Sequence, residues 1–201
     1  MDSSDKRMVT AIHEAGHAVV SHLLGLQILF VTLIDDSCGQ TVPESTGCHL
    51  CEDYHRYPPA PPDNHFRRIE KEFWYQAAVA SAGEITERVF FGEDHKIDPN
   101  DLIGDQEKLK NRIFIIHGKV EPLCSPSTCL HYETYIDVLN AEVRKIIEKQ
   151  KVRDAIQEIA NQLYSSANKD WLIGQKIHYS IGSFGLAYGS EIIQLPAIHS
   201  K

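Results

Sequence analysis

The sequence predicts a mainly α-helical fold with a small β element after its first helix. Two segments, from about residue 4 to 24 and from 132 to 165, carry apolar residues at the three- and four-residue spacing of amphipathic helices. Residues 28–34 form a short apolar run that fits a buried strand. With 201 residues, 42% of them hydrophobic, the chain is long enough to bury a core as one domain.

The remaining elements follow from residues that break or cap regular structure. The segment 35–64 is rich in Cys, Pro, Asp, Ser and His and is predicted to be a loop or insertion. Asp63 or Asn64 is a suitable cap for a second helix, which should end at Gly92. Residues 102–117 have a further helical pattern.

We therefore expect one domain over residues 1–178, with the insertion at 35–64, and a C-terminal tail over 179–201. Gly, Ser, Pro and scattered aliphatic residues from 181 onward are typical of a loosely packed tail or a partner contact.

The charge pattern argues against a nucleic-acid partner, because the net charge is −8 and the sequence contains no Lys/Arg-rich block. The most apolar stretch, residues 18–34, is shorter than a membrane-spanning helix and contains polar residues and Gly25. There is also no N-terminal pattern of a secretory signal. These observations predict a chain without a membrane segment and a cytoplasmic location.

His13, Glu14 and His17 form an HExxH motif within the first predicted helix. Residues four apart project from the same face of a helix, so the two imidazoles are placed to share one ion, for which zinc is the natural choice. Glu14 is then placed to take a proton from water activated by the ion, which is the chemistry of peptide hydrolysis. Gly16 costs about 1 kcal/mol in a helix interior, which close approach of another backbone would explain.

Several segments resemble, in the same order, the peptidase domain of FtsH-type ATP-dependent zinc metalloproteases. Residues 11–20, which include HEAGHA, resemble the zinc helix of that family. Residues 77–93 resemble its second helix, the Asn-Asp-Leu of residues 100–102 resembles the segment with its third zinc ligand, and residues 172–177 resemble a short element near its end. The resemblance covers most of residues 8–178 and implies a helical zinc-peptidase domain.

A catalytic zinc site needs a third protein ligand, and the first carboxylate after His17 is as distant as Asp35. The resemblance nominates Asp101 as this ligand. Asp98 is a rival, because Ile97-Asp98 stands where the family usually has Gly-Ala, and Asp105-Gln106 likewise replaces Ala-Thr. Glu87 matches a family glutamate and is either an alternative ligand or a carboxylate that receives the free imidazole N–H of a ligand.

The five cysteines raise the question of a second metal. A structural zinc cage is one interpretation, with four ligands supplied by two pairs: Cys48, Cys51, Cys124 and Cys129. Free or transiently oxidised thiols are the other.

The resemblance implies a zinc-dependent endopeptidase whose substrates are flexible or unfolded polypeptides. No GxxxxGK[ST] loop of an ATPase occurs in these residues, so unfolding would need a separate ATPase partner, and a homo-oligomer is the other assembly we expect. The substrate is expected to lie as an extended strand along residues 31–34. The alternative function is a catalytically inactive zinc-domain scaffold that binds a peptide or a partner protein.

Overall fold

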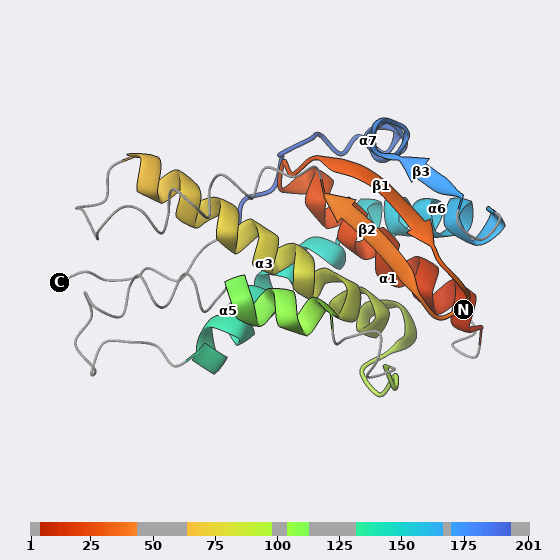
Figure 1. Ribbon diagram of the computed structural model, residues 1–201, viewed down its shortest axis with the longest axis horizontal. Helices are drawn as coiled ribbons and strands as arrows, with labels where there is room; N and C mark the ends of the chain where they lie inside the picture. Colours follow the sequence, from red (N-terminus) through yellow and green to blue (C-terminus); the bar gives the residue numbers. More distant parts are fainter. Residues whose placement is uncertain (1–4, 44–63, 98–103, 113–131, 167–169, 194–201) are drawn as a thin grey trace.

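The computed structural model describes residues 5–43, 64–97, 104–112, 132–166 and 170–193. As predicted, this part of the chain is mainly helical with a small antiparallel sheet (Figure 1). The helices are α1 (Lys6–Leu23), α3 (Asn64–Phe91), α5 (Tyr132–Ile147), α6 (Gln150–Ser165) and α7 (Gly174–Ser183), and residues 104–112 are also helical. The strands are β1 (Ile28–Leu33), β2 (Gly39–Pro43) and β3 (Trp171–Ile173).

Helix α1 is the central element of the fold. Asp5 caps its start, because a side-chain oxygen of Asp5 accepts a hydrogen bond from the Met8 backbone N–H at 3.2 Å. Gly25, with a φ of 77°, lies just after its end. Every residue from Thr10 to Leu23 is buried, because α3, α6 and the sheet surround the helix (Figure 1). The HExxH motif therefore lies inside the molecule, on its best-covered helix.

The sheet has the strand order β2-β1-β3, and both pairs are antiparallel. Strand β1 agrees with the predicted strand, but β2 lies in the segment expected to be a loop and β3 was not predicted. Both missed strands are short, and no residue of β2 is fully buried, so their sequences carry a weak pattern. Pairing with β1 is what orders them.

The central position of β1 corrects the expected mode of substrate binding. Residue Val31 pairs with Thr41 on one side and with Leu172 on the other. Thr32 is likewise paired on both sides, so a peptide has no open edge to join at Val31 and Thr32. The outer positions of the sheet belong to β2 and β3.

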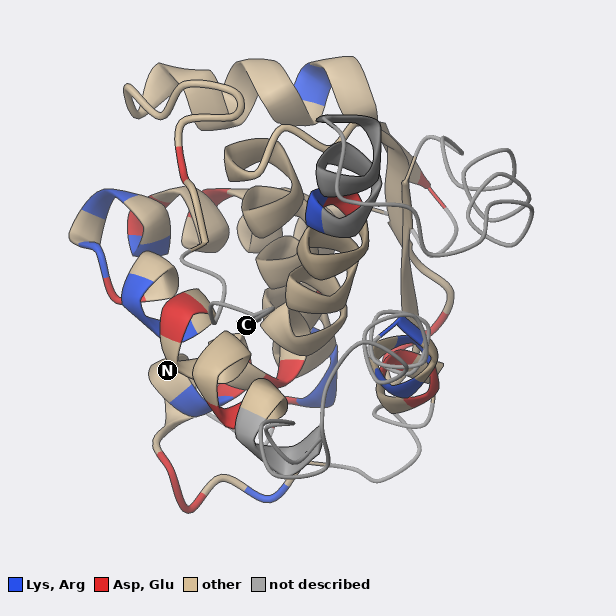
Figure 2. Cartoon of the chain, turned by 90° about the vertical axis from the view of Figure 1, so that its left-hand side faces the viewer, with Lys and Arg blue, Asp and Glu red and all other residues tan. Residues whose placement is uncertain are grey.

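Charged residues of both signs are interspersed on the face of the molecule seen in Figure 2. Among the described residues, no helix combines the length and apolar character needed to cross a bilayer.

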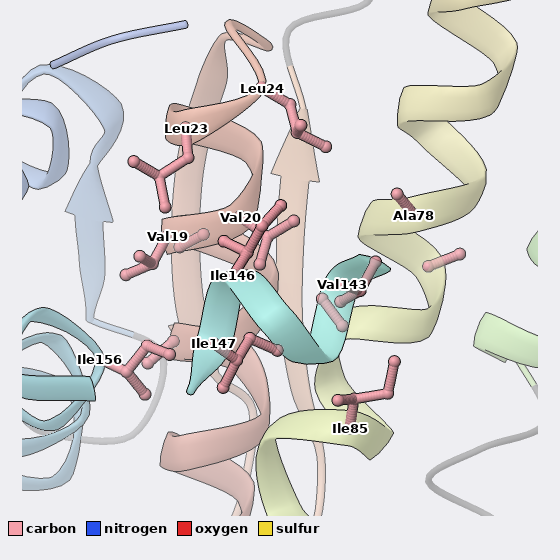
Figure 3. Packing of buried hydrophobic residues seen from close by; sticks show 14 of the residues in the cluster. Val19, Val20, Leu23, Leu24, Ala78, Ile85, Val143, Ile146, Ile147 and Ile156 are labelled. Atoms are coloured by element: carbon pink, nitrogen blue, oxygen red, sulfur yellow. The ribbon is translucent and has the colours of Figure 1, made fainter. Parts of the chain in front are cut away.

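The core forms where α1 meets α3, α5 and α6. Figure 3 shows apolar side chains of these four helices packed together, with Val19, Val20 and Leu23 supplied by α1. Contact with α3 is especially close: a Cβ at Gly16 would lie 2.2 Å from the Thr86 hydroxyl oxygen and 3.2 Å from the Ala82 carbonyl oxygen. The expected close approach of another backbone at Gly16 is therefore confirmed.

The helical stretch predicted over residues 132–165 is two helices, which corrects the expected continuity. Lys149 is extended, with ψ at 127°, so the chain changes direction between α5 and α6. Each helix buries an apolar stripe of its own, including Val143 and Ile147 on α5 and Val152 and Ile156 on α6. Periodicity alone does not reveal such a break, because both stripes keep helical spacing.

The C-terminal segment packs more closely than expected as far as residue 193. Helix α7 runs across residue 178, and Ile181 and Ile193 are buried in the core. The backbone N–H groups of Gly189 and Glu191 donate to the carbonyl oxygens of His22 and Leu23, each at 2.9 Å. This segment therefore covers the end of α1, while residues 194–201 lie outside the described part of the chain.

Candidate metal centre

Three side chains converge on one point beside α1. His13 and His17 project from successive turns of that helix, and their Nε2 atoms are 3.0 Å apart. A carboxylate oxygen of Asp105, Oδ2, lies 3.0 Å from Nε2 of His13 and 2.7 Å from Nε2 of His17. Asp105 belongs to the helical segment 104–112, so two elements distant in sequence build the cluster.

The chemistry of the cluster fits a divalent metal ion. Two imidazoles and a carboxylate are a typical set of three protein ligands for a catalytic zinc. Ligand atoms at about 2.1 Å from a tetrahedral zinc lie about 3.4 Å from one another, so a small outward shift of these side chains would suffice. Within the described ranges, His13, His17 and Asp105 are the group of His, Cys, Asp or Glu residues able to hold an ion.

Helix α3 fixes the orientation of both imidazole rings. Nδ1 of His13 lies 2.6 Å from a carboxylate oxygen, Oε1, of Glu87, and Nδ1 of His17 lies 2.6 Å from the carbonyl oxygen of Val79. Both partners are acceptors, so each Nδ1 carries the donated hydrogen and each Nε2 is directed toward the cluster. Glu87 therefore contacts Nδ1 of His13, on the side of the ring away from the ion-binding Nε2. This position suits a carboxylate that orients the imidazole better than it suits a metal ligand.

When no metal is present, the electrostatics of the cluster favour a protonated His13 beside an ionised Asp105. Burial disfavours a charged His13, but its hydrogen bonds to Asp105 and Glu87 and the nearby charge of Glu14 outweigh this effect and raise the pKa of His13 to about 10. Burial likewise opposes ionisation of Asp105, yet the two histidines hold the pKa of its carboxyl well below the usual range. A metal ion must therefore displace a proton, so metal affinity should rise with pH.

Glu14 is buried, with 6% of its surface exposed, and its carboxylate is held by β2. The hydroxyl of Thr41 lies 2.6 Å from Oε2 of Glu14 and donates to it. Gly39, on the same strand, packs so closely that a Cβ there would lie 2.4 Å from Cγ of Glu14. Neither residue was predicted to contact the motif, because β2 was expected to be a loop.

Gly83 on α3 is a second glycine that the site requires. A Cβ at this position would lie 2.3 Å from Nε2 of His13. The small Ala82-Gly83 pair, in the segment that resembles the family's second helix, was the sequence feature that indicated close packing here. The sequence did not show that His13 is the packing partner of Gly83.

Asp105 is the residue of the cluster that was not predicted from the sequence as a ligand. Its other oxygen, Oδ1, accepts a hydrogen bond from the Lys108 ammonium at 3.1 Å, one turn along the same helix. In the sequence, Asp105 departs from the family pattern, and this departure was the one feature that distinguished it from most other carboxylates. The nominated ligands Asp101 and Asp98 lie outside the described residues, as do four cysteines: Cys48, Cys51, Cys124 and Cys129.

A comparison of this chain with models of known protein families gives no match, and a comparison with curated proteins gives none either. The similarity to FtsH-type peptidases therefore stays a prediction that rests on the sequence motifs.

Proposed function

We propose that this protein is a zinc-dependent metallopeptidase that hydrolyses peptide bonds in flexible or unfolded polypeptides. The observation that carries the proposal is that the two HExxH imidazoles and the Asp105 carboxylate converge on one point. The motif glutamate, Glu14, follows His13 in the sequence and is also buried. Three protein ligands, as opposed to four, are typical of zinc sites that perform catalysis.

Each residue of the site has one role in the proposed mechanism. His13, His17 and Asp105 would hold the ion, which when bound polarises the substrate carbonyl and activates a water molecule. Glu14 would accept the proton of the attacking water and then give it to the leaving amine. Thr41 would keep the Glu14 carboxylate in place through the hydrogen bond to Oε2.

The outer edge of β2 is the favoured position for the substrate backbone. Among the strands in the described part of the chain, β2 is an outer one, and it carries Gly39 and Thr41 against Glu14. An extended polypeptide that joined β2 by backbone hydrogen bonds would run next to the general base, and such pairing selects weakly among sequences.

The geometry favours Asp105 over Glu87 as third ligand. Its Oδ2 meets both Nε2 atoms, whereas Glu87 meets Nδ1 of His13. Asp101 stays the ligand that the family resemblance predicts, and substitutions of the two aspartates separate these possibilities.

The function is tested with Glu14→Gln, which keeps the size of the side chain and removes its basicity. We expect this variant to bind zinc like the wild type and to cleave a labelled unfolded polypeptide at least about 100-fold more slowly, because general bases contribute about 10²–10⁴-fold. Glu84→Gln is the matched control: Glu84 is a partly exposed residue of α3 paired with Arg88, so its variant should cleave at the wild-type rate.

Cleavage by the wild type should also stop on addition of a chelator and return with zinc. Equal rates for wild type and Glu14→Gln would remove Glu14 from the mechanism. A wild-type protein that binds zinc and cleaves nothing would instead favour the inactive scaffold.

A further inference from the structure

Glu87 is engaged by two histidines, one on each carboxylate oxygen. Its Oε1 lies 2.6 Å from Nδ1 of His13, and its Oε2 lies 3.1 Å from Nε2 of His95. The carboxylate is almost fully buried, with 2% of the side chain exposed, and the His95 side chain is 9% exposed. A line of three buried side chains therefore leads from the candidate metal centre to His95, which the proposed mechanism does not use.

The end of α3 delivers His95 to this position. Gly92 follows the helix with a φ of 100°, a left-handed conformation that lets the chain turn back. The Gly92 N–H donates to the Arg88 carbonyl oxygen, and the His95 N–H donates to the Gly92 carbonyl oxygen at 3.1 Å. The imidazole of His95 then packs against the ring of Phe91, with the ring centroids 5.0 Å apart.

The turn is also anchored to neighbouring elements. Arg144 of α5 forms an ion pair with Glu93, and a side-chain nitrogen of Arg88 donates to the Glu93 carbonyl oxygen at 3.3 Å. Side chains of α3 and α5 thus contact the segment that precedes His95.

Glu87 determines which atoms donate and which accept in the line formed by His13, Glu87 and His95. An ionised carboxylate only accepts, so His95 must present a hydrogen on Nε2 and His13 a hydrogen on Nδ1. With one oxygen held by His95, the carboxylate is restrained from rotating away from His13. The ring of His13 then keeps Nε2 directed at Nε2 of His17 and Oδ2 of Asp105.

We propose that His95 is a positioning residue of the metal centre, which acts by clamping Glu87 in the orientation that holds His13 for zinc. This inference rests on the metal ion of the proposed function, but it does not depend on peptidase activity. Residues that orient a metal ligand typically change metal affinity by 10–100-fold when they are replaced.

The test compares His95→Gln with His95→Asn in the full chain. The amide nitrogen of Gln reaches the place of the histidine Nε2, whereas that of Asn reaches only the place of Nδ1. Zinc dissociation constants are measured by competition with a chromophoric chelator, at a temperature where both metal-free variants are folded. We expect zinc binding about 10-fold weaker for Asn and within about 3-fold of the wild type for Gln.

A double-variant cycle with Glu87→Gln shows whether His95 acts through Glu87. Once Glu87 is replaced, His95→Asn should weaken zinc binding by less than about 2-fold, since coupled residues are not additive. Equal affinities of wild type, Gln and Asn variants, or full additivity in the cycle, would overturn the inference and leave the metal centre intact. A wild-type chain that binds no zinc would overturn both.

Discussion

Gly83 shows how one residue decides whether the site exists. It lies where α3 crosses α1, and the space that its missing side chain leaves is occupied by the ring of His13. In Gly83→Ala the new methyl group would meet the imidazole, so we expect a loss of about 1–3 kcal/mol in the free energy of unfolding, as in other overpacked cores. Zinc binding should weaken in the same variant, which chemical denaturation and metal titration would measure.

Gly182→Ala is the matched control for that substitution. Gly182 is also helical, but a Cβ there would meet nothing within 4 Å. Its stability should be unchanged or raised by up to about 1 kcal/mol, because Ala favours a helix over Gly. Wild-type zinc affinity and stability in Gly83→Ala would show that α3 does not pack against His13 in this way.

At the scale of single residues, the sequence predicted what depends on local spacing. His13 and His17 meet because residues four apart share a helix face, and this geometry is independent of the rest of the fold. Asp105 and Thr41 reach the site through tertiary packing of segments far from α1 in sequence. Neither carries a motif that would have revealed its position, and Glu87 was found through the family resemblance alone.

Buried His22 of α1 contacts half-buried His178 of α7 and the C-terminal segment. Nδ1 of His22 lies 2.7 Å from Nδ1 of His178, and Nε2 of His22 lies 3.1 Å from the Leu186 carbonyl oxygen. His22 therefore donates through Nε2, and in its neutral form it accepts a hydrogen bond from His178 through Nδ1. Burial lowers the pKa of both rings, and for His178 the nearby His22 adds to the effect.

Acid should therefore loosen this contact between elements. A group with a lowered pKa in the folded state stabilises the fold above the pKa of the unfolded chain, about 6.5, and loses this contribution as the pH falls through its folded value. Relative to His178→Gln, the wild type should therefore lose free energy of unfolding from pH 7.5 to pH 5. The raised pKa of His13 acts in the opposite direction above pH 6.5, but it contributes equally to both proteins and cancels in the comparison. Identical pH profiles of wild type and variant, in urea unfolding followed by circular dichroism, would contradict this assignment.

Among the helices and strands, those with a strong periodic pattern were predictable from the sequence. The strands that depend on pairing with β1 were not. The first helix, the helix that ends near Gly92 and β1 follow the expected boundaries closely. Strands β2 and β3 form by pairing with the two edges of β1. This pairing is a tertiary contact, so no local sequence pattern predicts it. The break near Lys149 was hidden because both α5 and α6 keep the same helical spacing.

At the scale of the whole molecule, the candidate centre exists only in the folded chain. Its side chains come from α1, α3, β2 and residues 104–112, which are brought together by the core around α1. An ion that binds this cluster and not the unfolded chain must stabilise the fold, by about 4 kcal/mol at a free concentration 1,000 times its dissociation constant. The mainly helical class was predictable, whereas this assembly depends on the tertiary arrangement.

The candidate metal centre is tested by the metal content of the purified protein, with wild type compared with His13→Ala, Asp105→Ala and Asp101→Ala. We predict about one zinc per wild-type chain, its loss in His13→Ala and Asp105→Ala, and its retention in Asp101→Ala. Zinc retained in Asp105→Ala but lost in Asp101→Ala would restore the ligand implied by the family resemblance. A wild-type chain without zinc after reconstitution, or equal zinc in all four proteins, would contradict the proposed centre.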